Sequence, residues 1–236
     1  MSNIINPHRF AAAGFDNTYS VLNDGVADYV GGCDEQIGTG DVTISLWFKA
    51  SAVTATKCVW WGGAVTSSNT NAITAYFSST GNLLTQQPGG GNEGVSGLSA
   101  DTWYHYCLTR NGSAATGKIY VTAASAGSLA TAADITGIGA NLSASGRHIQ
   151  FGRYRNGHFF LNGYTDEVSI WSEEKDVAGV AGLYNSGVPG DLTDSSNLLS
   201  WWRMGDGDSG TTVTDVQGTA NLSLENGSAF AEVVPS

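Results

Sequence analysis

The chain has 236 residues, which is enough for one large β-sandwich or two small domains. Its 21 acidic residues outnumber its 10 lysines and arginines, and the formal net charge is −11. Because phosphate contacts need clustered cations, we expect no nucleic-acid partner, and the same balance disfavours anionic membranes. The acidic composition also has a simpler explanation, because a charged surface keeps a protein soluble.

The cysteines and the N-terminal residues indicate the cellular compartment in which the protein is made. Cys33, Cys58 and Cys107 are odd in number and lie in no Cys-x-x-Cys motif, so we expect them to be reduced and partly buried. The opening MSNIINPHRF lacks the apolar region of a signal peptide, and no stretch reaches the length of a membrane span. We therefore expect synthesis in the cytoplasm of a host cell, with no signal peptide and no membrane insertion.

The alternation of apolar and polar residues predicts an all-β fold. From residue 18 onward, short alternating runs are separated by Gly, Asn, Asp or Ser clusters. The runs WYHYCLTR at 103–110 and KIYVT at 118–122 predict a hairpin, because Asn111-Gly112 favours the positive φ angles of tight connections. So many strands require two stacked sheets or a barrel. In the run VTISLWFK, the residues expected to face the core are Val42, Ile44, Leu46 and Phe48.

One segment has helical spacing instead. In DVAGVAGLYNSG at 176–187, Asp176 is a candidate N-cap and Gly187 a candidate C′ residue. Because two internal glycines weaken the helix in isolation, we expect its apolar stripe to pack on a sheet. The stripe comprises Val177, Val180, Leu183 and Tyr184.

The N-terminal residues have a different sequence pattern from the rest of the chain. INPHRFAAAGF shows neither strand alternation nor a convincing helical pattern. We expect residues 1–17 to form an arm that becomes ordered against a partner, with a loose terminus as the alternative. Residues 18–236 are expected to form a single domain.

The stretch NGYTDEVSIWSEEKDVAGVAGLYNSG at 162–187 resembles the closing signature of laminin G-like, concanavalin A-like jelly rolls. Three further segments resemble the same family in order and spacing. Within 162–187, Thr165 departs from the pattern, because the family usually has an aliphatic residue at this position. The segment 198–229 is similar to the tail that follows such domains in bacteriophage and marine microbial proteins. The resemblance implies a two-sheet antiparallel jelly-roll sandwich with one short helix. The three segments are SVLNDGVADYV, VTISLWFK and TWYHYCLTRNG.

The sequence gives little support to catalysis. The Glu-x-Asp-x-Glu strand that places two carboxyl groups on one face in β-glucanases of this superfamily does not occur. Asp166 and Glu167 are adjacent, so on a regular strand they point to opposite faces, and Glu173-Glu174 suit the solvated start of a helix. We therefore expect the protein not to be an enzyme.

The four histidines are not spaced as metal ligands. His105 lies on a predicted strand between Trp103 and Cys107. We expect it to be a hydrogen-bonded core or interface residue.

A contact surface for a sugar or a partner is the more plausible site. Sugar binding needs exposed aromatic rings beside polar groups, although most aromatic residues of a sandwich fill its core. Arg147, Arg153 and Arg155 stand close together near two histidines, which suggests contact with an acidic neighbour, or else a solvated edge. The contact candidates are Trp60, Trp61, Tyr76, Arg153, Tyr154, Arg155 and Phe159.

The resemblance also implies a structural calcium ion. Its ligands would be some of Asp24, Asp28 and Asp166, because these positions match the family's opening turn and its closing strand. Hard cations prefer such oxygen ligands. Ordinary turn chemistry, in which Asp24 and Asp28 bond nearby backbone amides, is the alternative.

These expectations converge on a non-catalytic structural or adhesion protein. The resemblance favours a bacteriophage virion component, either a capsid decoration or a tail-associated protein, located in the virion. Its partners would be other virion proteins, copies of itself or surface glycans. A carbohydrate-binding lectin domain for host glycans is the first alternative, and a glycoside hydrolase the second.

Overall fold

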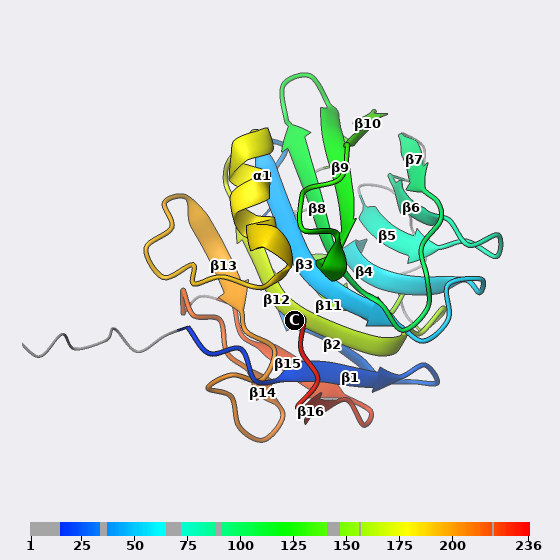
Figure 1. Cartoon of the computed structure of the whole chain (residues 1–236), viewed down its shortest axis with the longest axis vertical. Coiled ribbons are helices and arrows are strands. Elements are labelled where there is room, and N and C mark those ends of the chain that lie inside the picture. Colours follow the sequence, from blue (N-terminus) through cyan, green and yellow to red (C-terminus); the bar gives the residue numbers. More distant parts are fainter. Residues whose placement is uncertain are drawn as a thin grey trace, which may run out of the picture.

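The computed structural model describes residues 15–33, 37–64, 72–87, 91–140, 147–155, 157–218 and 220–236. These residues form two antiparallel sheets packed face to face, as the alternation predicts (Figure 1). Sheet A runs in the order β10 (Ala133–Thr136), β9 (Thr116–Ala123), β8 (Trp103–Asn111), β3 (Val42–Ala50), β12 (Asn162–Trp171), β1 (Ser20–Asp24) and β16 (Ala229–Ala231), and β13 (Leu198–Trp202) also pairs with β12.

Sheet B forms the second layer. Its order is β14 (Thr212–Val213), β15 (Leu222–Glu225), β2 (Tyr29–Cys33), β11 (Arg147–Phe151), β4 (Lys57–Ala64), β5 (Ile73–Phe77), β6 (Leu83–Gln86) and β7 (Asn92–Val95). Strands from the beginning, middle and end of the chain alternate within both sheets. The predicted jelly-roll sandwich is therefore confirmed.

The core lies between the two sheets. On β3, the four residues expected to face inward are all buried in the main apolar cluster, together with Trp60 of β4 and Trp202 of β13. Phe48 packs edge-on against Phe77 of β5, with ring centroids 6.0 Å apart, and so joins the two layers. The alternation in VTISLWFK thus identified the core face correctly.

The outer face of sheet A is also covered. Helix α1 (Val177–Tyr184) lies across this face, followed by a 3-10 turn at Asn185–Gly187 (Figure 1). Tyr184 stacks on Trp47, with ring centroids 6.0 Å apart, and its hydroxyl donates to the carbonyl of Ala123 at 2.8 Å. Val180 packs against Cys107 of β8 and a neighbouring tyrosine. Because the helix fills this face, the polar side of β3 is buried as well as its apolar side.

The structure confirms one of the two predicted ends of α1. The carboxylate of Asp176 accepts from the Gly179 amide at 2.8 Å, which confirms the predicted N-cap. The predicted C′ residue was wrong, because Asn185 takes the left-handed conformation directly after the helix. Gly187 belongs to the 3-10 turn that follows the helix. Its φ is +105°, and a Cβ at this position would lie 2.0 Å from the carbonyl oxygen of Ala124.

The predicted hairpin is β8 and β9, which pair antiparallel along their whole length. Its turn differs from the prediction, because the positive φ falls on Ala115 and not on Asn111-Gly112. Asn111 instead accepts from the Ala114 amide through its side chain, and Gly112 allows close approach to the backbone of residue 39.

Candidate functional site

The three predicted calcium ligands do not converge. Asp24 pairs with Asn162 in the β1–β12 ladder, so Asp166 lies four residues further along β12. At about 3.3 Å per residue, this spacing is on the order of 13 Å. A single ion held by all three carboxylates is therefore excluded, because the ladder separates them. Within the described residues, no group of three or more His, Cys, Asp or Glu side chains could hold a metal ion.

Asp24 and Asp28 hold a turn. Asp24 accepts from the Val26 amide at 2.7 Å, and this contact lowers the pKa of the exposed Asp24. Asp28 accepts from the Asp24 amide at 3.2 Å, while desolvation raises its pKa. This is the turn chemistry that the sequence left open as the alternative to calcium.

Asp166 and Glu167 form a buried acid pair. The sequence predicts that they point to opposite faces, and this prediction was wrong. A β-bulge interrupts the pairing of β12 with β3 between Asp166 and Ser169, and Glu167 takes the left-handed φ of +42°. Both carboxylates consequently lie on the outer side of sheet A, where Asp166 is opposite Trp47 and Glu167 bonds the indole of Trp201.

The N-terminal end of the described chain covers this pair. Arg203 donates to Glu167 at 3.0 Å and stacks over the Phe15 ring at 4.4 Å. The Asn17 side-chain amide donates to Asp166 at 2.9 Å. Asp166 is fully buried and Glu167 is 5% exposed, so no substrate reaches either carboxylate in this structure.

Burial raises the pKa of both acids. Desolvation raises the pKa of Glu167 to about 7, although Arg203 and the Trp201 indole oppose the shift. The pKa of Asp166 rises well above its ordinary value, because it is desolvated and lies beside Glu167. The two acids are adjacent and titrate together, so a proton retained near neutral pH belongs to the pair and not to one residue.

A second buried polar pair lies beneath α1. His105 contacts the Ser45 hydroxyl at 2.7 Å, and burial lowers the pKa of His105 to about 3. The prediction of a hydrogen-bonded core histidine is confirmed. Trp47 and Tyr184 close over the imidazole, so Ser45 is not placed as an accessible nucleophile.

Six of the seven predicted contact residues come together on the outer face of sheet B. We call this group the aromatic–arginine patch. Tyr154 packs edge-on against Trp61, with centroids 4.8 Å apart, and Phe159 lies 5.5 Å from Tyr154. Arg155 stacks on Tyr154 at 4.8 Å, and Phe159 is 46% exposed. Its members are Trp61, Tyr76, Arg153, Tyr154, Arg155 and Phe159.

A buried glutamine fixes the shape of the patch. Gln150 of β11 donates to the backbone carbonyls of Arg153 and Arg155, at 3.3 and 2.6 Å, and accepts from the Arg153 guanidinium at 2.6 Å. Arg155 and Phe159 both have left-handed φ, at +47° and +55°. These contacts preorganise the segment that carries the exposed side chains, and strained backbone of this kind is concentrated at binding sites.

Trp60 does not belong to the patch, and its prediction as a contact residue was wrong. It is fully buried in the main core, because a register shift between Cys58 and Trp60 turns Trp60 inward and Trp61 outward. Trp61 is also fully buried, beneath Tyr154, so it supports the patch without presenting a surface. The side chain of Arg147 lies outside the described part of the chain.

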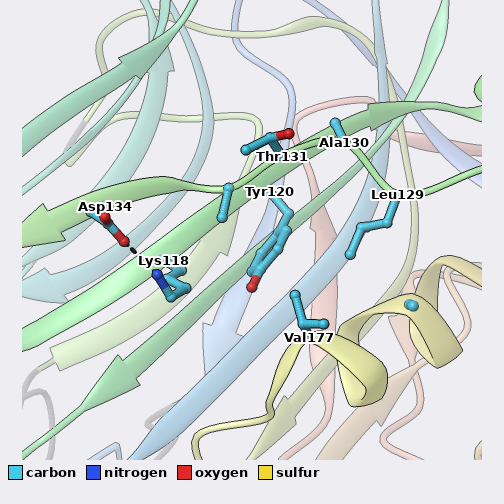
Figure 2. A pocket seen from close by; sticks show the side chains of 9 residues that line it. Lys118, Tyr120, Leu129, Ala130, Thr131, Asp134 and Val177 are labelled. Atoms are coloured by element: carbon cyan, nitrogen blue, oxygen red, sulfur yellow. Dashed lines mark hydrogen bonds and ion pairs between the residues drawn. The ribbon is translucent and has the colours of Figure 1, made fainter.

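A cleft that the sequence did not indicate lies beside α1 (Figure 2). We call it the Lys118 cleft. Its main cavity has a volume of about 600 Å³, and two adjoining cavities of about 300 Å³ each share Lys118. Figure 2 shows the Tyr120 side chain between Lys118 and Leu129, with Val177 at the start of the helix below it. The main cavity is lined by Lys118, Tyr120, Leu129, Ala130, Thr131, Ala132, Asp134, Val177 and Ala181.

Charged groups of both signs line this cleft. Lys118 and Asp134 form an ion pair of 2.5 Å at its mouth, and their side chains are 51% and 79% exposed. Glu174 and Asp176 line the adjoining cavities. The adjoining Lys175 is paired with Glu173 at 2.5 Å. An exposed ion pair contributes little to stability, so its groups can exchange partners readily.

Two stacked antiparallel sheets, with one helix against the outer face of sheet A, define a lectin-like jelly roll. No helix in the described ranges is long and apolar enough to span a membrane. The chain belongs to the concanavalin A-like lectin/glucanases superfamily, whose family model matches residues 24–181. Among curated proteins, no relative matches the sequence.

Solved structures share this fold at low sequence identity. A candidate carbohydrate-binding protein from Bacteroides ovatus superposes with a TM-score of 0.67 and 18% identity over 94% of this chain, which spans 62% of that protein. A heptameric SAP-like pentraxin from Limulus polyphemus gives 0.61 and 16%, over 92% of this chain and 97% of the pentraxin. Tailspike protein 2 of Escherichia coli O157:H7 bacteriophage CAB120 gives 0.55 and 13%, over 78% of this chain and 26% of the tailspike.

Proposed function

We propose that the protein is a non-catalytic adhesion module that binds glycans through the aromatic–arginine patch. The observation that carries this proposal is the convergence of Tyr76, Tyr154 and Phe159 with Arg155 on one outer face. Partly exposed rings bind the apolar C–H faces of sugars, and guanidinium groups donate hydrogen bonds to their oxygens.

The charge of the patch favours sugars that carry a carboxylate. Arg153 and Arg155 lie within three residues of each other, in a chain with only 10 lysines and arginines. A guanidinium can hold a carboxylate with two parallel hydrogen bonds, which a neutral hydroxyl does not offer. Uronic and sialic acids therefore suit this surface better than neutral hexoses.

The absence of catalysis is part of the proposal, and it rests on the acid pair. Glycosidases need two accessible carboxyl groups on either side of the scissile bond. Asp166 and Glu167 share one side of sheet A, but Asn17, Trp201 and Arg203 occupy them. An acid pair that is enclosed and hydrogen-bonded in this way maintains structure instead of attacking a substrate.

The place of this module in a virion belongs to the same proposal. The fold is shared with a bacteriophage tailspike, and residues 198–229 resemble the tail that follows such domains in phage proteins. An adhesion module on a capsid or tail would present its patch to host glycans. Its other contacts would be with virion proteins or with copies of itself.

Isothermal titration calorimetry tests the glycan site. We expect 3′-sialyllactose or a galacturonic acid oligomer to bind more tightly than lactose. Phe159→Ala and Arg155→Gln should each weaken binding about tenfold or more, since one stacking contact or one charge-assisted hydrogen bond is worth about 1.4 kcal/mol or more. The matched control is Val216→Ala, because Val216 is also 46% exposed but lies outside the patch.

Two outcomes would contradict the proposal. Equal affinity for lactose and its acidic counterparts would show that the arginines do not select the ligand. Unchanged binding by both patch variants, with melting temperatures like that of the wild type, would place the glycan elsewhere on the protein.

A further inference from the structure

The Lys118 cleft lies on the other sheet from the aromatic–arginine patch and is independent of it. Lys118 and Tyr120 extend from the outer face of β9, Asp134 from β10, and Val177 and Ala181 from α1. The cleft is therefore bounded by a helix on one side and by strands and a loop on the other (Figure 2).

The size of the cleft suits an extended ligand. Ligand pockets commonly have volumes of about 300 to 1,000 Å³, and the main cavity lies within this range at about 600 Å³. Both adjoining cavities share Lys118 with it, and they also share Glu174 with each other. A linear chain of a few units can follow this series of cavities, whereas a single small molecule would fill only one.

The polar groups at the mouth suit hydroxyl groups. The Asp134 carboxylate accepts hydrogen bonds and the Lys118 ammonium donates them, so neighbouring hydroxyls of one sugar ring can bond both ions. Leu129, Val177 and Ala181 supply aliphatic surface beside them. Val177 is 63% exposed, so a ligand there would cover apolar surface that now faces water.

The charges of the cleft disfavour an anion. Lys118 and Lys175 are each paired with a carboxylate, whereas Glu174 and Asp176 leave the adjoining cavities acidic. The start of α1 offers no anion site either, because Asp176 itself accepts from the Gly179 amide. A neutral ligand avoids repulsion by these carboxylates.

We propose that the Lys118 cleft is a second glycan site, which binds a neutral linear oligosaccharide. With the aromatic–arginine patch on sheet B, the molecule then carries two sites of different selectivity on opposite faces. Two such sites on opposite faces of one rigid sandwich allow the protein to cross-link a neutral glycan on one side with an acidic glycan on the other.

The test is a titration of the full chain with cellotetraose, maltotetraose and mannotetraose, followed by calorimetry and by the chemical shifts of the backbone amides. At least one of these should bind and shift amides of β9, β10 and α1. Lys118→Met and Asp134→Asn should each weaken binding about tenfold or more. Ala181→Trp, which fills the cleft without changing the ion pair, should abolish it.

Asp194→Asn is the matched control, since it removes an exposed carboxylate elsewhere, and Phe159→Ala should leave neutral binding unchanged. The proposal is overturned if none of the three tetrasaccharides binds at millimolar concentration, or if binding persists in Ala181→Trp. It is also overturned if only acidic saccharides shift the cleft residues. Loss of acidic-glycan binding in Phe159→Ala tests the aromatic–arginine patch alone. Failure of the patch is therefore distinguishable from failure of the Lys118 cleft.

Discussion

The buried acid pair makes the stability of the protein depend on pH, and Asp166→Asn should reduce that dependence. Asp166 is fully buried and accepts from the side chain of Asn17 and the backbone amide of Glu167, both at 2.9 Å. The amide variant keeps the shape of the side chain but carries no charge. The Asn17 side-chain oxygen, which has no hydrogen-bond partner among the described residues, can rotate to accept from the new amide group.

Folding raises the pKa of Asp166 in the same direction as that of Glu167, and the Glu167 pKa gives the scale of the effect. Folding raises this pKa from 4.5 to about 7, and each pKa unit corresponds to about 1.4 kcal/mol. The folded protein thus holds a proton that the unfolded chain releases. This contribution is complete below pH 4.5 and is lost as the pH rises to about 7, at an upper limit of about 3 kcal/mol.

Urea unfolding, followed by tryptophan fluorescence from pH 5 to pH 8, measures the effect. Wild-type stability should fall by about 1 to 3 kcal/mol over this range. Asp166→Asn should show a clearly smaller fall and should be more stable than the wild type at pH 8. Parallel curves, or a variant destabilised equally at every pH, would refute the reasoning, because Asp166 would then be ionised and needed as a carboxylate.

Three further predictions concern other parts of the molecule. Asp176→Ala should lower the free energy of unfolding by about 1 kcal/mol, because the Gly179 amide loses its cap, and chemical denaturation measures this against Asp194→Asn. Calcium binding at the turn of Asp24 and Asp28 alone, the part of the implied site that the ladder leaves together, should raise the melting temperature of the wild type and of Asp166→Asn but not of Asp24→Asn. No rise in the wild type would leave the two aspartates as turn formers. Deletion of residues 1–14, which include Ile4, Ile5 and Phe10, should weaken assembly and spare the fold, and unchanged oligomer mass in sedimentation would contradict a role for the arm.

Strand alternation and capping chemistry are local properties, and the sequence predicted them well. The inward face of β3 and the N-cap at Asp176 follow from side-chain period and from hydrogen-bond capacity within a few residues. The outward face of β3 was harder to predict. Its Ser45 and Trp47 are buried only because α1 packs over them, and that depends on contacts distant in sequence.

Bulges caused the two clearest errors. A strand of regular period would place Asp166 and Glu167 on opposite faces, but an extra residue with left-handed φ places both on one face. A second register shift, on β4, decided which of Trp60 and Trp61 faces the core. A glutamate with positive φ carries no sequence signal, whereas a glycine or asparagine would have given one.

The candidate sites differ in how much the sequence could indicate. The patch is formed largely by residues 153–155 and 157–159, so its arginines and rings are already neighbours in the sequence. The Lys118 cleft combines β9, β10 and α1, and its lining residues run from Lys118 to Ala181 along the chain. Lys118 stands at an outward strand position and Val177 on an apolar helical stripe, but neither pattern predicts that the two face each other.

Mapping of the acidic glycan site by nuclear magnetic resonance tests the central claim most directly. With 3′-sialyllactose or a galacturonic acid oligomer, we predict that the largest amide shifts fall on residues 153–155 and 157–159 and on Tyr76 of β5. Shifts confined to β9, β10 and α1, or no shift in the patch at saturating glycan, would contradict the account.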